Sequence, residues 1–300
     1  MRVAFVTTVD LAAIHDDVDL PLQKAAFAAA GIDLLQVAWE DESAKWDAFD
    51  LVVVRSPWNY VEHLAEFRAW LDARRGTCRL HNPVPLLEWN LNKRYLDDLG
   101  ERGVATVPTL FAETLKSFRT ASAAMSSEEI VVKPSISAGS RFTGRFRADD
   151  PRAEELAQAI LANGLTAMVQ PYAQRIDTEG EIGTVLFDGA ISHSFRKAAL
   201  LDQDGALVGG TYREEISAVL APDDVLEVVR DAATASLSIA RENGWIGESD
   251  ELLYGRYDVI RRDDGSPALL EAELFEPCFF LSTDPDAANR FVQAVIARLS

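Results

Sequence analysis

Apolar runs alternate with amphipathic stretches along the N-terminal part of the chain. The runs predict strands and the stretches predict helices, in the order Arg2–Thr7 strand, Pro21–Ala30 helix, Asp33–Trp39 strand, Asp50–Arg55 strand and Val61–Arg74 helix. Such alternation is typical of an open α/β layer with parallel strands. The loop after the first strand has no GxGxxG, so the pattern does not support a dinucleotide fold of the usual kind.

The pattern changes at His81–Pro85, a connection with two prolines that we interpret as a domain boundary. A helix over Leu86–Gly100 follows, and Phe111–Ala173 predicts a small α+β unit. The remainder predicts hairpin-like strands with two long helices, over Asp223–Asn243 and Asp286–Leu299. The expected organisation is an α/β domain over residues 1–81, a central region with an α+β lobe over 82–173, and a second α+β lobe over 174–300.

The stretch Leu252–Phe275 carries the densest candidate chemistry. Two apolar-alternating segments flank the sequence DDGS, which favours a β-hairpin. Arg256 and Asp258 share one face of the first strand, and Glu271 and Glu273 share one face of the second, because strand side chains two apart point the same way. If these faces coincide, three carboxylates meet and need a cation, and oxygen ligands without Cys or His suit Mg²⁺ or Mn²⁺. The alternative is a hairpin face that points to water.

A lysine at the end of an apolar strand indicates phosphate binding. Lys133 ends the segment IVVK, and the loop Ser135–Gly144 after it is rich in small and hydroxyl residues. A point charge beside closely approaching backbone N–H groups suits a polyphosphate, although GxxxxGK[ST] is absent. The alternative is a structural Lys-Pro strand end. By itself Lys93, on the predicted helix, is expected to face solvent, and the strand Met168–Ala173 ends with backbone groups available for an adenine ring.

Composition narrows the partners. The 300 residues carry a formal net charge of −19, which speaks against a general nucleic-acid or anionic-membrane binder because such proteins need cationic surface. Cys78 and Cys278 are far apart and suit reduced thiols. The N-terminus reads as a strand and not as a signal peptide, and no apolar run is long enough to span a membrane. We therefore expect a cytoplasmic protein with a small-molecule substrate.

Taken in order, the lysine, strand-Lys-Pro, QPY, EGE, basic-strand, RxD and ExE motifs resemble the ATP-grasp superfamily over about residues 82–300. The resemblance implies an ATP-grasp fold, with ATP between two α+β lobes, and a carboxylate activated as an acyl phosphate that a nitrogen nucleophile attacks. For ATP it implies Lys93 and Lys133 on the phosphates, Ser137, Ala138, Gly139 and Ser140 in a covering loop, Gln170, Pro171, Tyr172 and Ala173 as the adenine hinge, and Glu179 on the ribose. For metal it implies Asp258, Glu271 and Glu273 around Mg²⁺, or Mn²⁺, with Arg256 on the transferring phosphoryl. The family's last metal ligand is usually Asn, and this chain has Glu273 there.

Several stretches are similar to a small bacterial branch of that superfamily that contains a cycloserine-forming cyclo-ligase. They are VTTVDLAAIHDD, RSPWNY, NLNKRYL, KPSISAGSRFTGRF, SHSFRK and LEAELFEPCFF. The resemblance implies phosphorylation of O-ureido-D-serine and ring closure to D-cycloserine. Two alternatives remain at this point: an intermolecular ligase that joins a carboxylate to an amine, such as a dipeptide or glutamate ligase, and a non-catalytic nucleotide sensor.

The substrate site is expected at the C-terminal ends of the N-terminal strands, where open α/β sheets bind ligands. The candidates in this position are Asp10, His15, Asp16, Ser56, Trp58, Asn59 and Tyr60. A cation for the substrate carboxylate is expected from Arg196, ahead of Lys197 and Arg55, and the alternative for each is a surface ion pair. The long helices could support a homodimer.

Overall fold

The N-terminal part of the chain forms the parallel layer that the sequence predicts. The computed structural model describes residues 1–10, 17–139, 141–199, 201, 206–207 and 215–299. The first sheet is parallel and has the order β2-β1-β3-β4. Its elements are β1 (Arg2–Thr7), α2 (Leu20–Ala29), β2 (Asp33–Ala38), η1 (Trp46–Ala48), β3 (Leu51–Ser56), η2 (Trp58–Val61), α3 (Leu64–Arg74) and β4 (Leu80–His81). The predicted strands and helices are confirmed, and β4 adds an edge strand.

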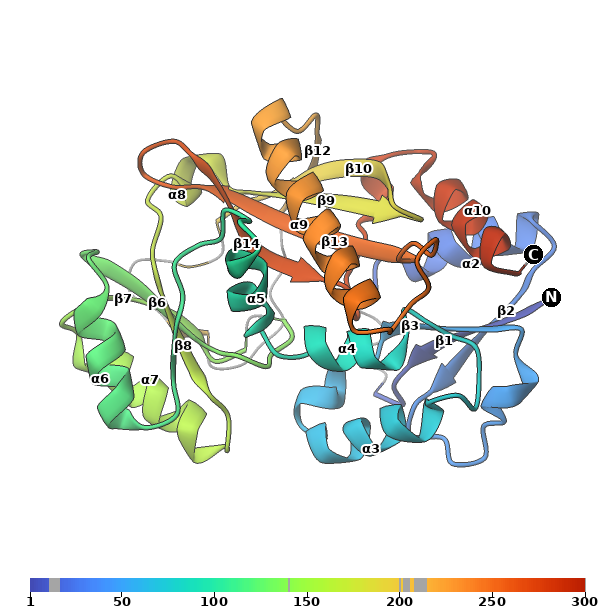
Figure 1. The fold of residues 1–300 in the computed structure, drawn as a ribbon, viewed down its shortest axis with the longest axis horizontal. Helices are drawn as coiled ribbons and strands as arrows, with labels where there is room; N and C mark the ends of the chain where they lie inside the picture. The colour runs from blue at the N-terminus through green and yellow to red at the C-terminus, as the bar shows by residue number, and fades with distance from the viewer. Residues whose placement is uncertain (11–16, 140, 200, 202–205, 208–214, 300) are drawn as a thin grey trace.

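The small lobe is an antiparallel sheet with two helices on one face (Figure 1). The strand order is β11-β7-β6-β8-β5, and α6 and α7 pack against each other and against these strands. The elements are β5 (Leu110–Ala112), α6 (Leu115–Ala124), β6 (Glu129–Pro134), β7 (Thr143–Arg147), α7 (Pro151–Ala162), β8 (Ala167–Pro171) and β11 (Ala206–Leu207). Buried apolar side chains between helices and sheet, such as Phe118, Ile130 and Ile160, form a core of their own.

The C-terminal lobe contains the predicted hairpin. Its sheet has the order β12-β10-β9-β13-β14, and the long helix α9 packs on β13 and β14 (Figure 1). The elements are α8 (Ile176–Glu179), β9 (Glu181–Phe187), β10 (Ala190–Lys197), β12 (Ile216–Val219), α9 (Asp223–Glu242), β13 (Tyr254–Arg261), β14 (Pro267–Glu273), η3 (Leu281–Thr283) and α10 (Ala287–Leu299). Helix α10 of the C-terminal lobe packs against α2 of the N-terminal layer. Phe5, Phe27 and Phe291 therefore form one aromatic core between these two units.

One predicted helix is wrong. Leu86–Gly100 is divided into α4 (Val84–Asn90) and α5 (Tyr95–Glu101), and Lys93 lies in the break between them. The cause is tertiary: the Asn90 amide donates to the Ala272 carbonyl and accepts from the Leu274 N–H, both at the end of the hairpin. The backbone N–H of Lys93 donates to the Ser135 carbonyl instead of continuing a helix. The break therefore fixes Lys93 against both lobes.

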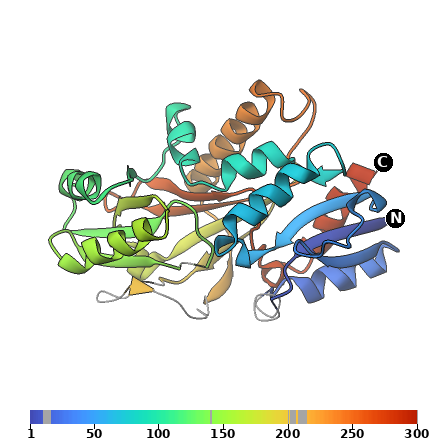
Figure 2. The same cartoon turned by 90° about the horizontal axis from the view of Figure 1, so that it is seen from below.

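A second buried amide connects the N-terminal layer to the hairpin. Asn82 is fully buried; its amide donates to the carbonyls of Tyr254 and Leu274 and accepts from the N–H of Leu253. Because a buried backbone group needs a partner, this side chain fixes the position of β13 and β14 relative to β4. In the perpendicular view the small lobe and the N-terminal layer lie at opposite ends, with strands of the C-terminal lobe between them (Figure 2). No helix among the described residues is long and apolar enough to cross a membrane.

Candidate active site

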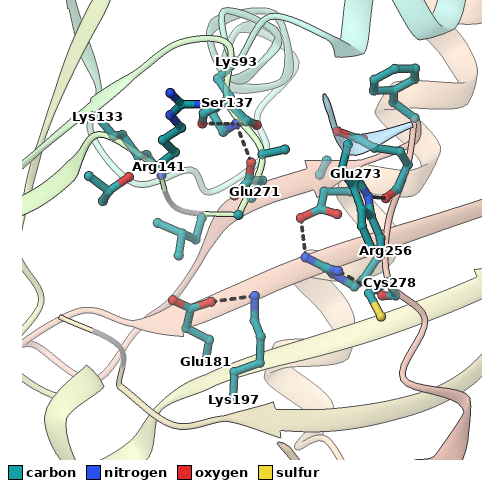
Figure 3. A pocket seen from close by; sticks show the side chains of 18 of the residues that line it. Lys93, Lys133, Ser137, Arg141, Glu181, Lys197, Arg256, Glu271, Glu273 and Cys278 are labelled. Carbon is teal, nitrogen blue, oxygen red and sulfur yellow. Dashed lines mark hydrogen bonds and ion pairs between the residues drawn. The ribbon is translucent and has the colours of Figure 1, made fainter. Parts of the chain in front are cut away.

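A cavity of about 890 Å³ lies where the three units meet. Its wall contains a large part of the set predicted from sequence: Lys93, Lys133, Ser137, Ala138, Gly139, Gln170, Pro171, Tyr172, Ala173, Trp58, Asn59, Tyr60, Lys197, Arg256, Glu271 and Glu273. Figure 3 shows the contacts of Lys93 with Glu271, Lys197 with Glu181 and Arg256 with Glu273 in this space. Asp16 and Ser140 lie outside the described residues.

The charged residues of the hairpin share one face. Across β13 and β14, Arg256 pairs with Glu273 and Asp258 pairs with Glu271, and directly opposed residues in an antiparallel pair point to the same side. Asp258 is 1% exposed and Arg256 is 6% exposed. The alternative of a face that points to water is therefore wrong.

Each of the three carboxylates on this face, those of Asp258, Glu271 and Glu273, contacts a cation. Lys93 lies 2.8 Å from Glu271, Lys197 lies 2.7 Å from Asp258, and Arg256 contacts both Asp258 and Glu273. Burial alone would raise the pKa of Asp258 and of Glu271, but the neighbouring cations outweigh burial and hold both values at about 2. For Glu273, burial prevails over Arg256 and raises the pKa to about 8. The two deepest carboxylates are therefore ionised at neutral pH because cations surround them.

Two lysines face the same space from different elements. Lys93 also donates to the carbonyl and hydroxyl oxygens of Ser137, each at 3.3 Å, so it contacts the loop that follows β6. Lys133 is the penultimate residue of β6, and burial lowers its pKa. Among the described residues it makes no ion pair within 4 Å. Lys133 is therefore the cation most available to an anionic ligand.

The segment after β8 is held from outside the cavity. The Gln170 amide donates to the Thr109 hydroxyl at 2.8 Å, and the Arg145 guanidinium lies 3.5 Å from the centre of the Tyr172 ring. Tyr172 also donates a hydrogen bond to Asp177. These contacts fix the predicted hinge while its residues line the cavity.

Among the residues that the structure describes, five of those predicted are not in the cavity wall: Arg55, Ser56, Glu179, Arg196 and Asp258. Arg196 is exposed and donates to the carbonyls of Thr178 and Glu179, because neighbouring residues of β10 point to opposite faces and Lys197 takes the inner one. Glu179 contacts Arg175 on the surface. Ser56 and Arg55 are buried below the cavity, where Arg55 donates to the Pro277 carbonyl. Asn59 lines the cavity, but its amide is bonded to Trp39 and Glu40.

Three carboxylates in the described part of the cavity wall, Glu62, Glu181 and Glu276, were not predicted from the sequence; Glu62 contacts Arg141. Glu181 lies opposite Lys197 across β9 and β10, with 3.0 Å between their charged groups. Strand alternation could have identified Glu181, because it lies opposite Lys197 on the neighbouring strand and points to the same face. Glu276 follows β14 in irregular backbone, where no periodic pattern indicates direction.

The carboxylates of the cavity fit a metal ion whose remaining ligands would come from the phosphates of a nucleotide. Among the described residues, no group of three or more His, Cys, Asp or Glu side chains is placed to hold a metal ion without further ligands. Mg²⁺ usually binds one or two carboxylates together with substrate phosphates. Glu271 and Glu273 face the cavity and suit that role. Asp258 lies deeper, held by Arg256 and Lys197, and its role as a ligand stays a prediction.

Two α+β lobes around a cavity lined with lysines and carboxylates define an ATP-grasp ligase. D-alanine–D-alanine ligase from Bacillus anthracis has this fold, with a TM-score of 0.69 at 14% identity over 100% of this chain and 97% of that chain. The crystal structure of D-cycloserine synthetase DcsG gives a TM-score of 0.91 at 35% identity, with 100% of both chains covered. The cycloserine biosynthesis protein DcsG of Streptomyces lavendulae is 35% identical over 302 residues, 97% of each chain.

The N-terminal layer has its own match. The family profile described as D-cycloserine synthetase DcsG, N-terminal domain, matches residues 3–82. The chain therefore belongs to the DcsG family of ATP-grasp proteins, and it is an ATP-dependent ligase. The resemblance inferred from the sequence motifs is confirmed at the level of family and fold.

Proposed function

We propose that this protein converts O-ureido-D-serine to D-cycloserine with ATP. The observation that supports the proposal most is the 35% identity over 97% of the chain to a protein of cycloserine biosynthesis. The cavity supports it as well, because Lys93, Lys133 and Arg256 gather positive charge in a chain whose net charge is −19. Phosphoryl transfer requires mainly positioning and cations around the phosphate oxygens.

In the first step the substrate carboxylate attacks the γ-phosphorus of ATP. An acyl phosphate forms and ADP leaves. Lys93 and Lys133 hold the phosphates in this proposal, and Arg256 compensates charge on the transferring phosphoryl. Lys197, and not Arg196 as the sequence suggested, neutralises the substrate carboxylate in this proposal, because its ammonium faces the cavity. The loop from Ser137 to Gly139 covers the phosphates, the segment Gln170–Ala173 holds the adenine, and Glu181 replaces Glu179 as the candidate for the ribose.

In the second step the ureido nitrogen attached to oxygen attacks the acyl carbon and expels phosphate. The five-membered ring closes, and water then removes the carbamoyl group as carbon dioxide and ammonia. One water is consumed overall, together with the conversion of ATP to ADP and phosphate. A tethered nucleophile has a very high effective molarity, so the protein mainly needs to fold the substrate and exclude water.

Glu271 and Glu273 are the residues we propose for Mg²⁺, with Mn²⁺ as an alternative. When bound, the metal supplies positive charge to the phosphate oxygens of ATP. Glu273 stands where the wider family usually has Asn, and a carboxyl oxygen serves as well as an amide oxygen as a ligand.

Release of phosphate from ATP over a panel of amino acids and derivatives tests the proposal. Turnover with O-ureido-D-serine alone, and formation of D-cycloserine by mass spectrometry, is the expected result. Turnover only with pairs of amino acids would instead show an intermolecular ligase. Nucleotide binding without turnover of any substrate would show a sensor, a reading that the intact set Lys93, Lys133, Arg256 and Glu271 disfavours.

We further propose an amino-acid-like carboxylate as the small-molecule partner and the cytoplasm as the location. A homodimer stays a prediction, and sedimentation equilibrium of the purified protein measures it directly.

A further inference from the structure

The carboxylate of Glu276 has no role in the reaction proposed so far. It lines the cavity three residues after Glu273, on the side of the N-terminal layer. Glu181, Glu271 and Glu273 in the same wall each contact a lysine or an arginine. In the described part of the chain, no lysine, arginine or histidine comes within 4 Å of the Glu276 carboxylate. This acid therefore differs from its neighbours, because none of the described cations pairs with it.

The position of Glu276 is fixed by the loop after β3. The Trp58 indole donates to the Glu276 carbonyl at 3.1 Å, and the Tyr60 hydroxyl interacts with the Glu276 side chain. Tyr60 is itself 2% exposed, and its ring meets Phe275 edge-on at 5.1 Å. Trp58 thus fixes the backbone of Glu276, and the buried Tyr60 lies beside its carboxylate.

Such a position is costly for an ionised group. Burial raises the pKa of Glu276 to about 7, and Tyr60 and the more distant Lys93 only partly oppose this effect. A half-buried carboxylate without a cation is disfavoured unless a ligand supplies the charge. A cationic ligand group in this cavity would offset the cost of burying the ionised Glu276 carboxylate.

We propose that Glu276, positioned by Tyr60 and Trp58, binds the α-ammonium group of the amino-acid substrate. The inference rests on the proposed function and adds the group that recognises an amino acid rather than a simple carboxylic acid. Glu276 lies close enough to Lys93 and Glu271 for their charges to act on it. An ammonium held there would keep the substrate carboxylate near the phosphate-binding lysines. Asp10 also lines the cavity, but it is exposed to solvent, which screens an ion pair.

The test compares Glu276→Gln with Glu276→Asp and with Glu66→Gln, whose carboxylate is exposed on α3 and outside the cavity. The substrates are O-ureido-D-serine and 3-(ureidooxy)propanoate, which lacks only the ammonium group. We expect Glu276→Gln to raise the KM for the amino acid by about 10² while the KM for ATP changes less than about twofold. Preference for the amino acid over its des-amino analogue should disappear, Glu276→Asp should partly restore it, and Glu66→Gln should match the parent protein.

An equal loss of kcat/KM for both substrates would show that Glu276 does not recognise the ammonium group. A fall in kcat at unchanged KM would assign it to proton transfer and would also overturn the inference. Should Glu276→Gln not fold, Tyr60→Phe supplies the test, because it removes only the hydroxyl that orients the carboxylate and should raise the same KM by roughly 3–10-fold.

Calorimetry separates this inference from the proposed function. Binding of the two ligands to the full-length protein with a non-hydrolysable ATP analogue and Mg²⁺ requires no turnover. If O-ureido-D-serine proves not to be a substrate, the proposed function fails, and a panel of D- and L-amino acids with their des-amino counterparts is measured in the same way. Binding of any amino acid more tightly than its counterpart, lost in Glu276→Gln, supports the inference, and equal affinities in every pair overturn it.

Discussion

Replacement of Glu271 by glutamine separates catalysis from stability at the centre of the site. The Lys93 ammonium lies 2.8 Å from the Glu271 carboxylate, and the two side chains are 9% and 21% exposed. Removal of one partner from a buried ion pair costs about 3–5 kcal/mol when the other charge is left alone. Here the glutamine oxygen still accepts from Lys93, and Ser137 offers two further acceptors at 3.3 Å.

We therefore expect Glu271→Gln to lower the free energy of unfolding by only about 1–2 kcal/mol. For a chain of this size that corresponds to a fall in Tm of roughly 2–8 °C, which leaves the protein folded at 25 °C. The substitution removes the charge that the proposed mechanism places beside the phosphates and on the metal, so kcat should fall by about 10² or more. Nucleotide binding should require a higher Mg²⁺ concentration, because a carboxylate ligand has been removed.

The assays are phosphate release under saturating ATP, Mg²⁺ titration of nucleotide affinity, and thermal unfolding. Glu88→Gln is the matched control, because Glu88 also pairs with an arginine, Arg75, and is 32% exposed but lies outside the cavity. It should lose less than about 1 kcal/mol and keep its activity. A Glu271→Gln protein that retains kcat within about threefold of the parent would refute the assignment of Glu271 to the phosphate and metal site.

Three further outcomes follow from the structure. Lys197→Met should reduce kcat/KM by about 10² or more in steady-state assays, whereas the adjacent Arg196→Met should change it less than about threefold; equal effects would contradict their placement on opposite faces of β10. Asn82→Ala leaves three buried backbone groups unpaired and should lower stability by about 3 kcal/mol or more in denaturant titrations, while the exposed Asn163→Ala should cost less than about 1 kcal/mol. In the folded protein the pKa of Glu276 is raised from 4.5 to about 7, so the fold loses stability as the pH rises between these values. Glu276→Gln should therefore reduce the fall in stability from pH 5 to pH 8 by at most about 3 kcal/mol. An unchanged fall would disprove the shift.

Local periodicity predicted the elements and the face of the hairpin, because both depend on neighbouring residues. Alternation placed Arg256, Asp258, Glu271 and Glu273 in phase, and the register across β13 and β14 confirms it. The division of the predicted helix around Lys93 depends on hydrogen bonds to a segment about 180 residues away. No window of sequence contains that information.

The choice between Arg196 and Lys197 shows a second limit. Both residues end the same strand, and alternation states only that they point to opposite faces. Which face is inner depends on the sheet that β10 joins and on the carboxylates of Glu181 and Asp258 that meet Lys197 there. Glu276 has no periodic context at all, so only the tertiary position of Tyr60 identifies it as a residue of the site.

The pairing of cations with carboxylates explains how an acidic chain keeps a site for a polyanion. Lys93, Lys197 and Arg256 are buried. Without partners, their mutual repulsion and the loss of hydration would disfavour the ionised forms. Asp258 and Glu271 compensate that charge before any nucleotide arrives, and Arg256 also contacts Glu273, whose pKa burial raises to about 8. Phosphate oxygens can then replace a carboxylate as the partner of a lysine, and the carboxylate that is released can bind the metal that accompanies the nucleotide. In the proposed mechanism the same groups keep the empty site stable and supply ligands when the site is occupied, which is why substitutions here should reduce turnover far more than stability.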